Sequence, residues 1–241
     1  MKNYANIEFL RKRFDKVNSY YGAKGLAPQL SLLRIEENLV DGKGVYDFNI
    51  KKENLSGVES NLKRNDLFVT ISLAIATRIE VEAQPNVNVP NFSPLIGQTH
   101  DSSGTTVVDL AGFSTDDILA LYNGSLQINT GTTVNFADLP TALFLRQQSD
   151  DVSTIFGTSV EVRNKKFNFV DDMQVMAEEV IFAGTQDHKI QLSFPTYANA
   201  NYSATDGATA KVVFMALGWR VVGGTSETYK NDSANPYKGC I

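Results

Sequence analysis

Two long apolar stretches constrain the fold of this chain more than any other feature. They are residues 67–81, LFVTISLAIATRIEV, and residues 211–222, KVVFMALGWRVV. The Val, Ile and Thr content of the first favours a long strand at the centre of a sheet, because a strand that is covered on both faces reads as a continuous apolar run. Residues 73–76 alone would also tolerate a helix. The two stretches predict two core strands that are far apart in the sequence.

Shorter segments alternate apolar with polar residues, which is the pattern of a strand with one buried face. Such strands are expected at 46–50, 105–110, 125–129, 134–136, 158–163, 166–170 and 188–194. Residues 30–35 fit a short strand or a turn of helix, and 175–182 are equally ambiguous.

About eight to ten strands without regular alternation of strand and helix predict an all-β fold. We expect an antiparallel β-sandwich of the jelly-roll type, with an N-terminal amphipathic helix and a short helix in one connection. In a jelly roll, early and late strands lie in the same sheet, which suits the two long apolar stretches.

The 241 residues are expected to form one body with two separable ends. No Pro/Gly/Ser-rich linker divides the middle of the chain, and a hydrophobic fraction of 42% permits a substantial core. We expect an N-terminal arm over 1–28, a sandwich body over 29–222 and a polar tail over 223–241.

The only cysteine, Cys240, excludes a disulfide framework within one chain. Neither a membrane span nor a signal peptide is recognisable, so an intracellular product is expected.

Apolar residues near the N-terminus recur at steps of three or four, which predicts a helix over 4–21 with one apolar side. These residues are Ile7, Leu10, Phe14, Val17 and Tyr21.

The same segment is basic. Through residue 25 the chain has six basic and two acidic residues, a net charge of +4, and because the whole chain carries −5, the remainder carries −9. Such a split is typical of an arm that meets nucleic acid or an anionic membrane surface, and a solvated helix face is the alternative. The residues expected to face that partner are Lys2, Arg11, Lys12, Arg13 and Lys16.

Residues 114–144 predict a short helix followed by a hairpin. Asp116 and Asp117 suit the first turn of the helix, where the helix dipole favours negative charge. Asn123 and Gly124 are expected to end the helix with a left-handed residue. Nothing in this stretch is a catalytic motif.

No arrangement of residues elsewhere predicts catalysis, a metal site or a cofactor. A nucleophile with a histidine base needs a His beside it, and only His100 and His188 exist. His188 opens a strand, so an edge or surface position is expected, and His100 with Asp101 is too small a set to hold a metal. We therefore expect the chain not to be an enzyme.

Three further acidic pairs are interpreted as solvated charge in turns, because neighbours in sequence do not face each other across a cleft and no calcium-loop motif is present. They are Asp150-Asp151, Asp171-Asp172 and Glu178-Glu179.

Aromatic residues could alternatively form a sugar-binding platform. Tyr197 and Tyr202 fall in the predicted loop 195–208, and loop 83–104 is a second candidate surface. Trp219 lies inside an apolar strand, so it is expected in the core. A carbohydrate-binding or adhesive module of a particle is the alternative function.

One short pattern carries a resemblance. Residues 117–124, DILALYNG, are followed by the strand 125–129 and later by 143–146, between the two long apolar stretches. This order resembles virion proteins of bacteriophages that infect Bacteroidetes-type hosts, over residues 65–222. The resemblance implies a jelly-roll capsid subunit that is made in the host cytoplasm and resides in the virion. The implied partners are copies of itself and other virion proteins, with packaged nucleic acid or an internal membrane at the basic helix, and no catalytic residues carry over.

Overall fold

The computed structural model describes residues 2–53, 55, 59–81, 99–100, 106–108, 120–145, 173–195, 202 and 208–224. Over these residues the chain is mostly antiparallel β-sheet with one α-helix, α1 (Lys2–Gly22), an arrangement consistent with an all-β sandwich. Helix α1 covers the residues for which the apolar spacing predicts a helix.

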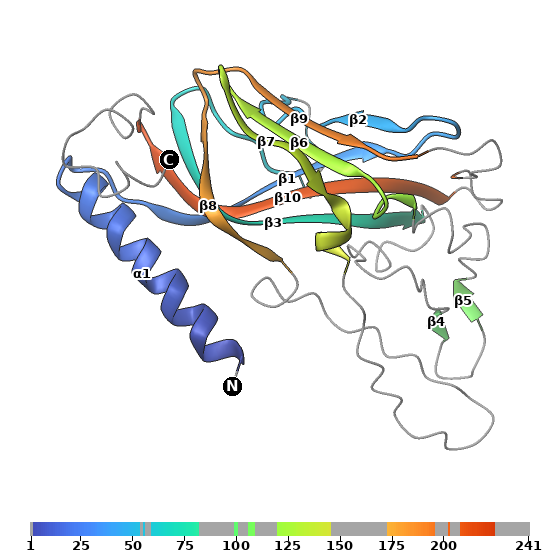
Figure 1. The fold of residues 1–241 in the computed structure, drawn as a ribbon, viewed down its shortest axis with the longest axis horizontal. Coiled ribbons are helices and arrows are strands. Elements are labelled where there is room, and N and C mark those ends of the chain that lie inside the picture. Colours follow the sequence, from blue (N-terminus) through green and yellow to red (C-terminus); the bar gives the residue numbers. More distant parts are fainter. Residues whose placement is uncertain are drawn as a thin grey trace.

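Two four-stranded sheets make up the body (Figure 1). Sheet A contains, in spatial order, β1 (Gln29–Asn38), β10 (Ala208–Val222), β3 (Asp66–Val81) and β8 (Gln174–Ala183). Sheet B contains β2 (Val45–Asp47), β9 (His188–Ser193), β6 (Ser125–Thr130) and β7 (Thr133–Pro140). A small separate pair joins β4 (Thr99–His100) to β5 (Thr106–Val108), and a 3-10 helix, η2, spans Thr141–Phe144.

The strand pairs are nested. β1 pairs with β10, β2 with β9, β3 with β8 and β6 with β7, all antiparallel. This is the pairing of one long hairpin whose tip is the β6–β7 turn. Two further pairings, β10 with β3 and β6 with β9, join neighbouring parts of that hairpin into the two sheets. Consecutive strands of the two sheets therefore alternate between the sheets, except at the hairpin tip.

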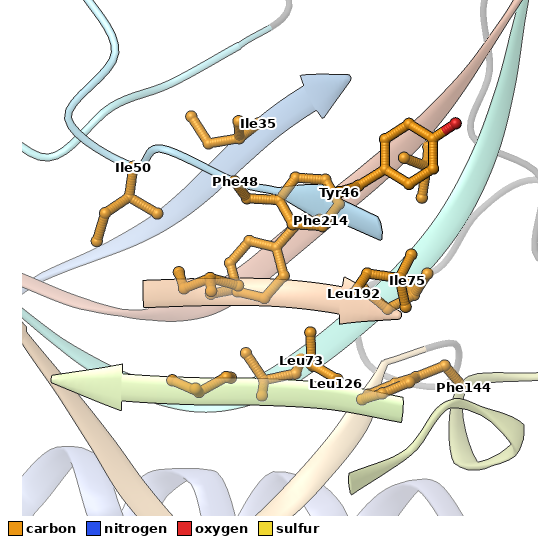
Figure 2. Close-up of a cluster of buried hydrophobic side chains, with 14 of the residues drawn as sticks. Ile35, Tyr46, Phe48, Ile50, Leu73, Ile75, Leu126, Phe144, Leu192 and Phe214 are labelled. Carbon is orange, nitrogen blue, oxygen red and sulfur yellow. The ribbon is translucent and has the colours of Figure 1, made fainter. Parts of the chain in front are cut away.

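The main core lies between the sheets, where side chains from both meet (Figure 2). The rings of Phe48 and Phe214 lie 5.6 Å apart, and those of Tyr46 and Phe194 are stacked at 5.7 Å. Leu126 and Leu192 of sheet B are buried against this cluster, as is Ile75 of sheet A. Burial of this apolar surface is the dominant stabilising contribution.

Helix α1 lies on the face of sheet A that is turned away from sheet B (Figure 1). A second apolar cluster joins this helix to sheet A. Val17 and Tyr21 of the helix are buried there against Val69 and Trp219. The ring of Phe14 lies 5.8 Å from that of Trp219, which is only 3% exposed. The prediction that Trp219 belongs to the core is therefore confirmed.

The two long apolar stretches are central strands of one sheet, as predicted. β3 and β10 pair with each other along most of their length, and each has a second strand on its other side. The ambiguous segments 30–35 and 175–182 are the strands β1 and β8. Strands also form where predicted at β2, β5, β6, β7 and β9, although β2 is shorter than 46–50.

Several expectations fall outside the described residues. The strands at 158–163 and 166–170 do so, as does the polar tail beyond residue 224. Of residues 114–124, where a short helix is expected, the structure describes only residues 120–124.

Gly124 corrects one expectation. It was predicted to adopt a left-handed conformation, yet its φ is not positive, and among the described residues only glycines 25, 42, 131 and 223 have positive φ. A Cβ at Gly124 would lie 2.1 Å from the carbonyl oxygen of Ser193. Glycine is required here because the end of β9 approaches closely, not because of the turn conformation. Leu121 and Tyr122, just before it, are buried in the main core.

Candidate functional site

The basic helix α1 is held on sheet A by one apolar side and by one ion pair. The Arg13 Nε lies 3.8 Å from Oε1 of Glu179 on β8, and both side chains are largely buried. Arg13 was predicted to face an anionic partner. Its guanidinium lies instead against the body of its own chain. Glu179 was interpreted as solvated turn charge, and this is wrong, because Glu179 lies on a strand beneath α1.

The other basic residues of the helix that the structure describes lie at its surface. Arg11, Lys12 and Lys16 are exposed, and Lys12 forms a surface ion pair of 3.0 Å with Glu8 one turn earlier. The side chain of Lys2 lies outside the described residues. Three of the five predicted residues are thus exposed on α1, and whether they meet a polyanion stays a prediction.

A buried network of charges lies elsewhere on sheet A and was not predicted. The carboxylate of Glu36 on β1 accepts hydrogen bonds from Arg34 on the same strand, at 2.6 Å from Nη2, and from Arg78 on β3. The side chains of Glu36 and Arg78 are 3% and 5% exposed. A buried carboxylate needs such paired donors, since an isolated buried charge is very costly. Arg78 and Glu36 are distant in sequence, so no local pattern could have revealed the pair.

Beside this network, Lys52 and Glu59 form another pair next to the outer edge of β1. Their Nζ and Oε1 atoms are 3.1 Å apart, and the Glu59 side chain is 3% exposed. Oε1 of Glu59 also accepts a hydrogen bond from the backbone N–H of Glu36 at 3.0 Å. Residues 59 and 60, in the connection between β2 and β3, therefore lie directly on the edge of sheet A.

His188 occupies a structural position at the β8–β9 turn. Its Nε2 donates a hydrogen bond to the Ala183 carbonyl oxygen at 2.7 Å, and its ring meets Phe182 edge-on at 5.3 Å. Burial lowers the pKa of the His188 imidazole. The nearby charges are Lys51 and Asp187, which pair with each other at 2.9 Å. No nucleophile accompanies His188 in these contacts, in keeping with a strand-end role.

The remaining candidate residues are placed as follows. Tyr202, proposed for an exposed sugar platform, is 3% exposed and packs in the main core, so this part of the platform is wrong. Tyr197, Cys240, the side chain of His100 and the acidic pairs at 116–117, 150–151 and 171–172 lie outside the described residues.

Burial also raises the pKa of the Tyr122 hydroxyl, which donates to the Ile75 carbonyl oxygen at 3.3 Å.

Among the residues that the structure describes, no group of three or more His, Cys, Asp or Glu side chains is arranged to hold a metal ion. Within the same residues, no helix has the length and apolar character needed to cross a membrane.

Comparisons with protein-family models, with curated proteins and with solved structures find no match to this chain.

Proposed function

We propose that this chain is a structural virion protein, a capsid subunit built on a single jelly roll that assembles with copies of itself into a closed shell. The observation that carries the proposal is the strand order. A jelly roll is an antiparallel ribbon wrapped into two sheets of four strands each, an architecture used by viral capsid proteins. The orders β1-β10-β3-β8 and β2-β9-β6-β7, with their nested pairing, support this topology.

The eight strands of sheets A and B are enough for one complete roll, which favours a single roll over a double one. The resemblance of 117–124 to phage virion proteins points in the same direction. In the folded chain this segment contributes Leu121 and Tyr122 to the core and Gly124 to the contact with β9. The motif therefore supports a fold-level role, without catalytic residues or a cofactor.

The docked helix α1 supports a contact with packaged nucleic acid. Its apolar side is buried on sheet A, so the exposed Arg11, Lys12 and Lys16 project from the body on a fixed support. Cations held in this way bind phosphates with an affinity that falls as salt rises. An internal membrane or a neighbouring subunit would use the same surface.

The first test is the size of the native assembly. The purified chain of 26.5 kDa is expected to form large, uniform particles as its concentration rises, seen by multi-angle light scattering and negative-stain microscopy. The α1-deleted chain is the comparison, because it lacks the helix that covers sheet A. A full-length protein that stays strictly monomeric at high concentration contradicts the proposal.

The second test concerns the basic helix. The triple variant R11Q/K12Q/K16Q is expected to bind nucleic acid more weakly and to lower the slope of log K against log salt by about 2 to 3. K63Q/R64Q/K189Q removes three exposed cations from the body and is the matched control. Equal salt slopes for the two variants would show that α1 does not neutralise phosphates.

A further inference from the structure

An Asn-Gly pair, Asn123-Gly124, lies directly before β6, where the fold requires the glycine. Asparagine followed by glycine is the pair most prone to spontaneous deamidation, because glycine has no side chain to hinder the backbone nitrogen as it approaches the asparagine amide. A Cβ at Gly124 would collide with the Ser193 carbonyl oxygen and with Phe194. The packing therefore keeps a glycine here, and with it a reactive pair.

The reaction joins two groups within the pair. The backbone nitrogen of Gly124 loses its proton to solvent base and attacks Cγ of the Asn123 side chain. A bond forms between this nitrogen and Cγ, the bond from Cγ to Nδ2 breaks, and ammonia leaves with a proton taken from water. Water then opens the resulting succinimide ring to aspartate or isoaspartate. Because Cγ takes the place of the amide hydrogen, it must approach along the direction in which the Gly124 N–H points.

A buried threonine occupies that direction. The Gly124 N–H donates to Oγ1 of Thr141 at 2.9 Å. Thr141 also holds the other backbone group of the glycine, because its N–H donates to the Gly124 carbonyl oxygen at 2.9 Å. Thr141 is the first residue of η2 and is fully buried. Since Ser125 pairs with Pro140 beside them, these two hydrogen bonds close the open end of the β6–β7 hairpin.

Asn123 is exposed, so water and solvent base can reach its surroundings. The restraint on the reaction lies instead at the glycine. While the Gly124 N–H points at Thr141, Cγ of Asn123 cannot take the position of the amide hydrogen. The reaction must wait until this hydrogen bond opens, and the free energy of that local opening lowers its rate.

We propose that Asn123 is a latent site of deamidation and that Thr141 holds it unreactive in the folded chain. The site becomes reactive when the end of the β6–β7 hairpin opens. Isoaspartate then adds a carbon atom to the backbone directly before Gly124. Because Gly124 is packed against Ser193 and Phe194, a longer backbone cannot keep both this packing and the hydrogen bonds to Thr141. The modification therefore keeps the hairpin end from closing again. This inference rests on the hairpin alone and is independent of the capsid proposal.

The test compares threonine variants by their rate of deamidation at Asn123. Thr141→Val removes the hydroxyl and keeps the shape of the side chain, whereas Thr141→Ser keeps the hydroxyl. The matched control is Thr130→Val, which removes another buried hydroxyl of the same hairpin, the acceptor for Nδ2 of Asn135 at 2.9 Å. Each full-length chain is incubated at mildly alkaline pH, either folded or in urea. Peptide mapping by mass spectrometry follows aspartate and isoaspartate at residue 123.

In the folded state, Thr141→Val is expected to deamidate at least tenfold faster than the wild type, because its Gly124 N–H has lost its acceptor. Thr141→Ser and Thr130→Val are expected to react as slowly as the wild type. In urea all four chains are expected to react at one rate, at least tenfold above that of the folded wild type, because the contact is absent there.

A measurement on the wild type alone serves if Thr141→Val does not fold. Hydrogen exchange at the Gly124 amide gives the fraction of chains in which its hydrogen bond is open. The folded wild type should deamidate at the urea rate multiplied by this fraction.

Any of four results would overturn the inference. They are a folded wild type that deamidates as fast as in urea, a folded Thr141→Val no faster than the wild type, a Thr130→Val as fast as Thr141→Val, and slow deamidation of a wild type whose Gly124 amide exchanges freely.

Discussion

The two sheets bury their strands differently. In sheet A, residues 66–78 of β3 and 212–216 of β10 are buried without interruption. In sheet B, β6 alternates half-buried with buried residues, and β9 follows a similar alternation. The outer face of sheet A is covered in part by α1 and its apolar cluster and in part by a further cluster that includes Met173. In β6 and β9 of sheet B, every second residue is half-buried or exposed. Continuous and alternating apolar patterns in the sequence thus correspond to strands with two covered faces and strands with one.

The comparison predicts its largest effect at the outer face of sheet A. Trp219→Ala removes a buried ring from beneath α1 and is expected to lower the free energy of unfolding by about 3–5 kcal/mol. Gln127→Ala, on the outer side of β6, is expected to change it by no more than about 0.5 kcal/mol. Urea unfolding of both variants measures the difference. Similar costs would mean that α1 does not cover sheet A as described.

Charges should show the same contrast. Arg78→Met leaves the buried Glu36 carboxylate with one fewer partner on sheet A and is expected to cost about 3 kcal/mol. Lys51→Met breaks the pair with the fully exposed Asp187 near the end of sheet B, which is expected to cost less than about 1 kcal/mol. Thermal unfolding at two salt concentrations checks both values. A cost for Lys51→Met as large as that for Arg78→Met would contradict the assigned burial.

The smallest effect is a pH dependence at the turn that leads from sheet A to sheet B. Because burial lowers the pKa of folded His188, the unfolded chain binds this proton more readily. Stability should therefore fall as pH drops below about 6.5, the ordinary histidine value, and level off below the folded-state pKa. His188→Gln keeps a donor for the Ala183 carbonyl and should lose this part of the dependence. Parallel curves of stability against pH for the wild type and His188→Gln, between pH 5 and 8, would refute a contribution of His188 to the pH dependence.

Several features of the fold were predictable because their signals are local. The apolar runs of β3 and β10, the alternation in β6 and β9 and the turn between β6 and β7 each depend on neighbouring residues. Residues 30–35 and 175–182 were ambiguous because their local patterns do not decide between strand and helix. Their strand conformation, in β1 and β8, is decided by pairing with β10 and β3, which lie far away in the chain.

The positions of the candidate functional residues, on α1 and at Tyr202, were predictable only in part. The spacing of apolar residues identified the side of α1 that packs, with Val17 and Tyr21 buried. Spacing and charge could not show that Arg13 turns toward the body, because its partner Glu179 lies on β8. Tyr202 was misjudged for the same reason, since a tyrosine in a polar segment gives no sign that the main core surrounds it.

The sequence by itself determined which segments become strands with one or two covered faces, because hydrophobic periodicity reports burial directly. It also determined that the N-terminal helix is basic on an acidic chain. Only the tertiary structure decided the nested pairing of the strands, the Arg34–Glu36–Arg78 network and the cover of the β1 edge by Glu59 and Ser60. Apart from the Arg34–Glu36 pair, these contacts join residues far apart along the chain, so they exist only in the folded chain.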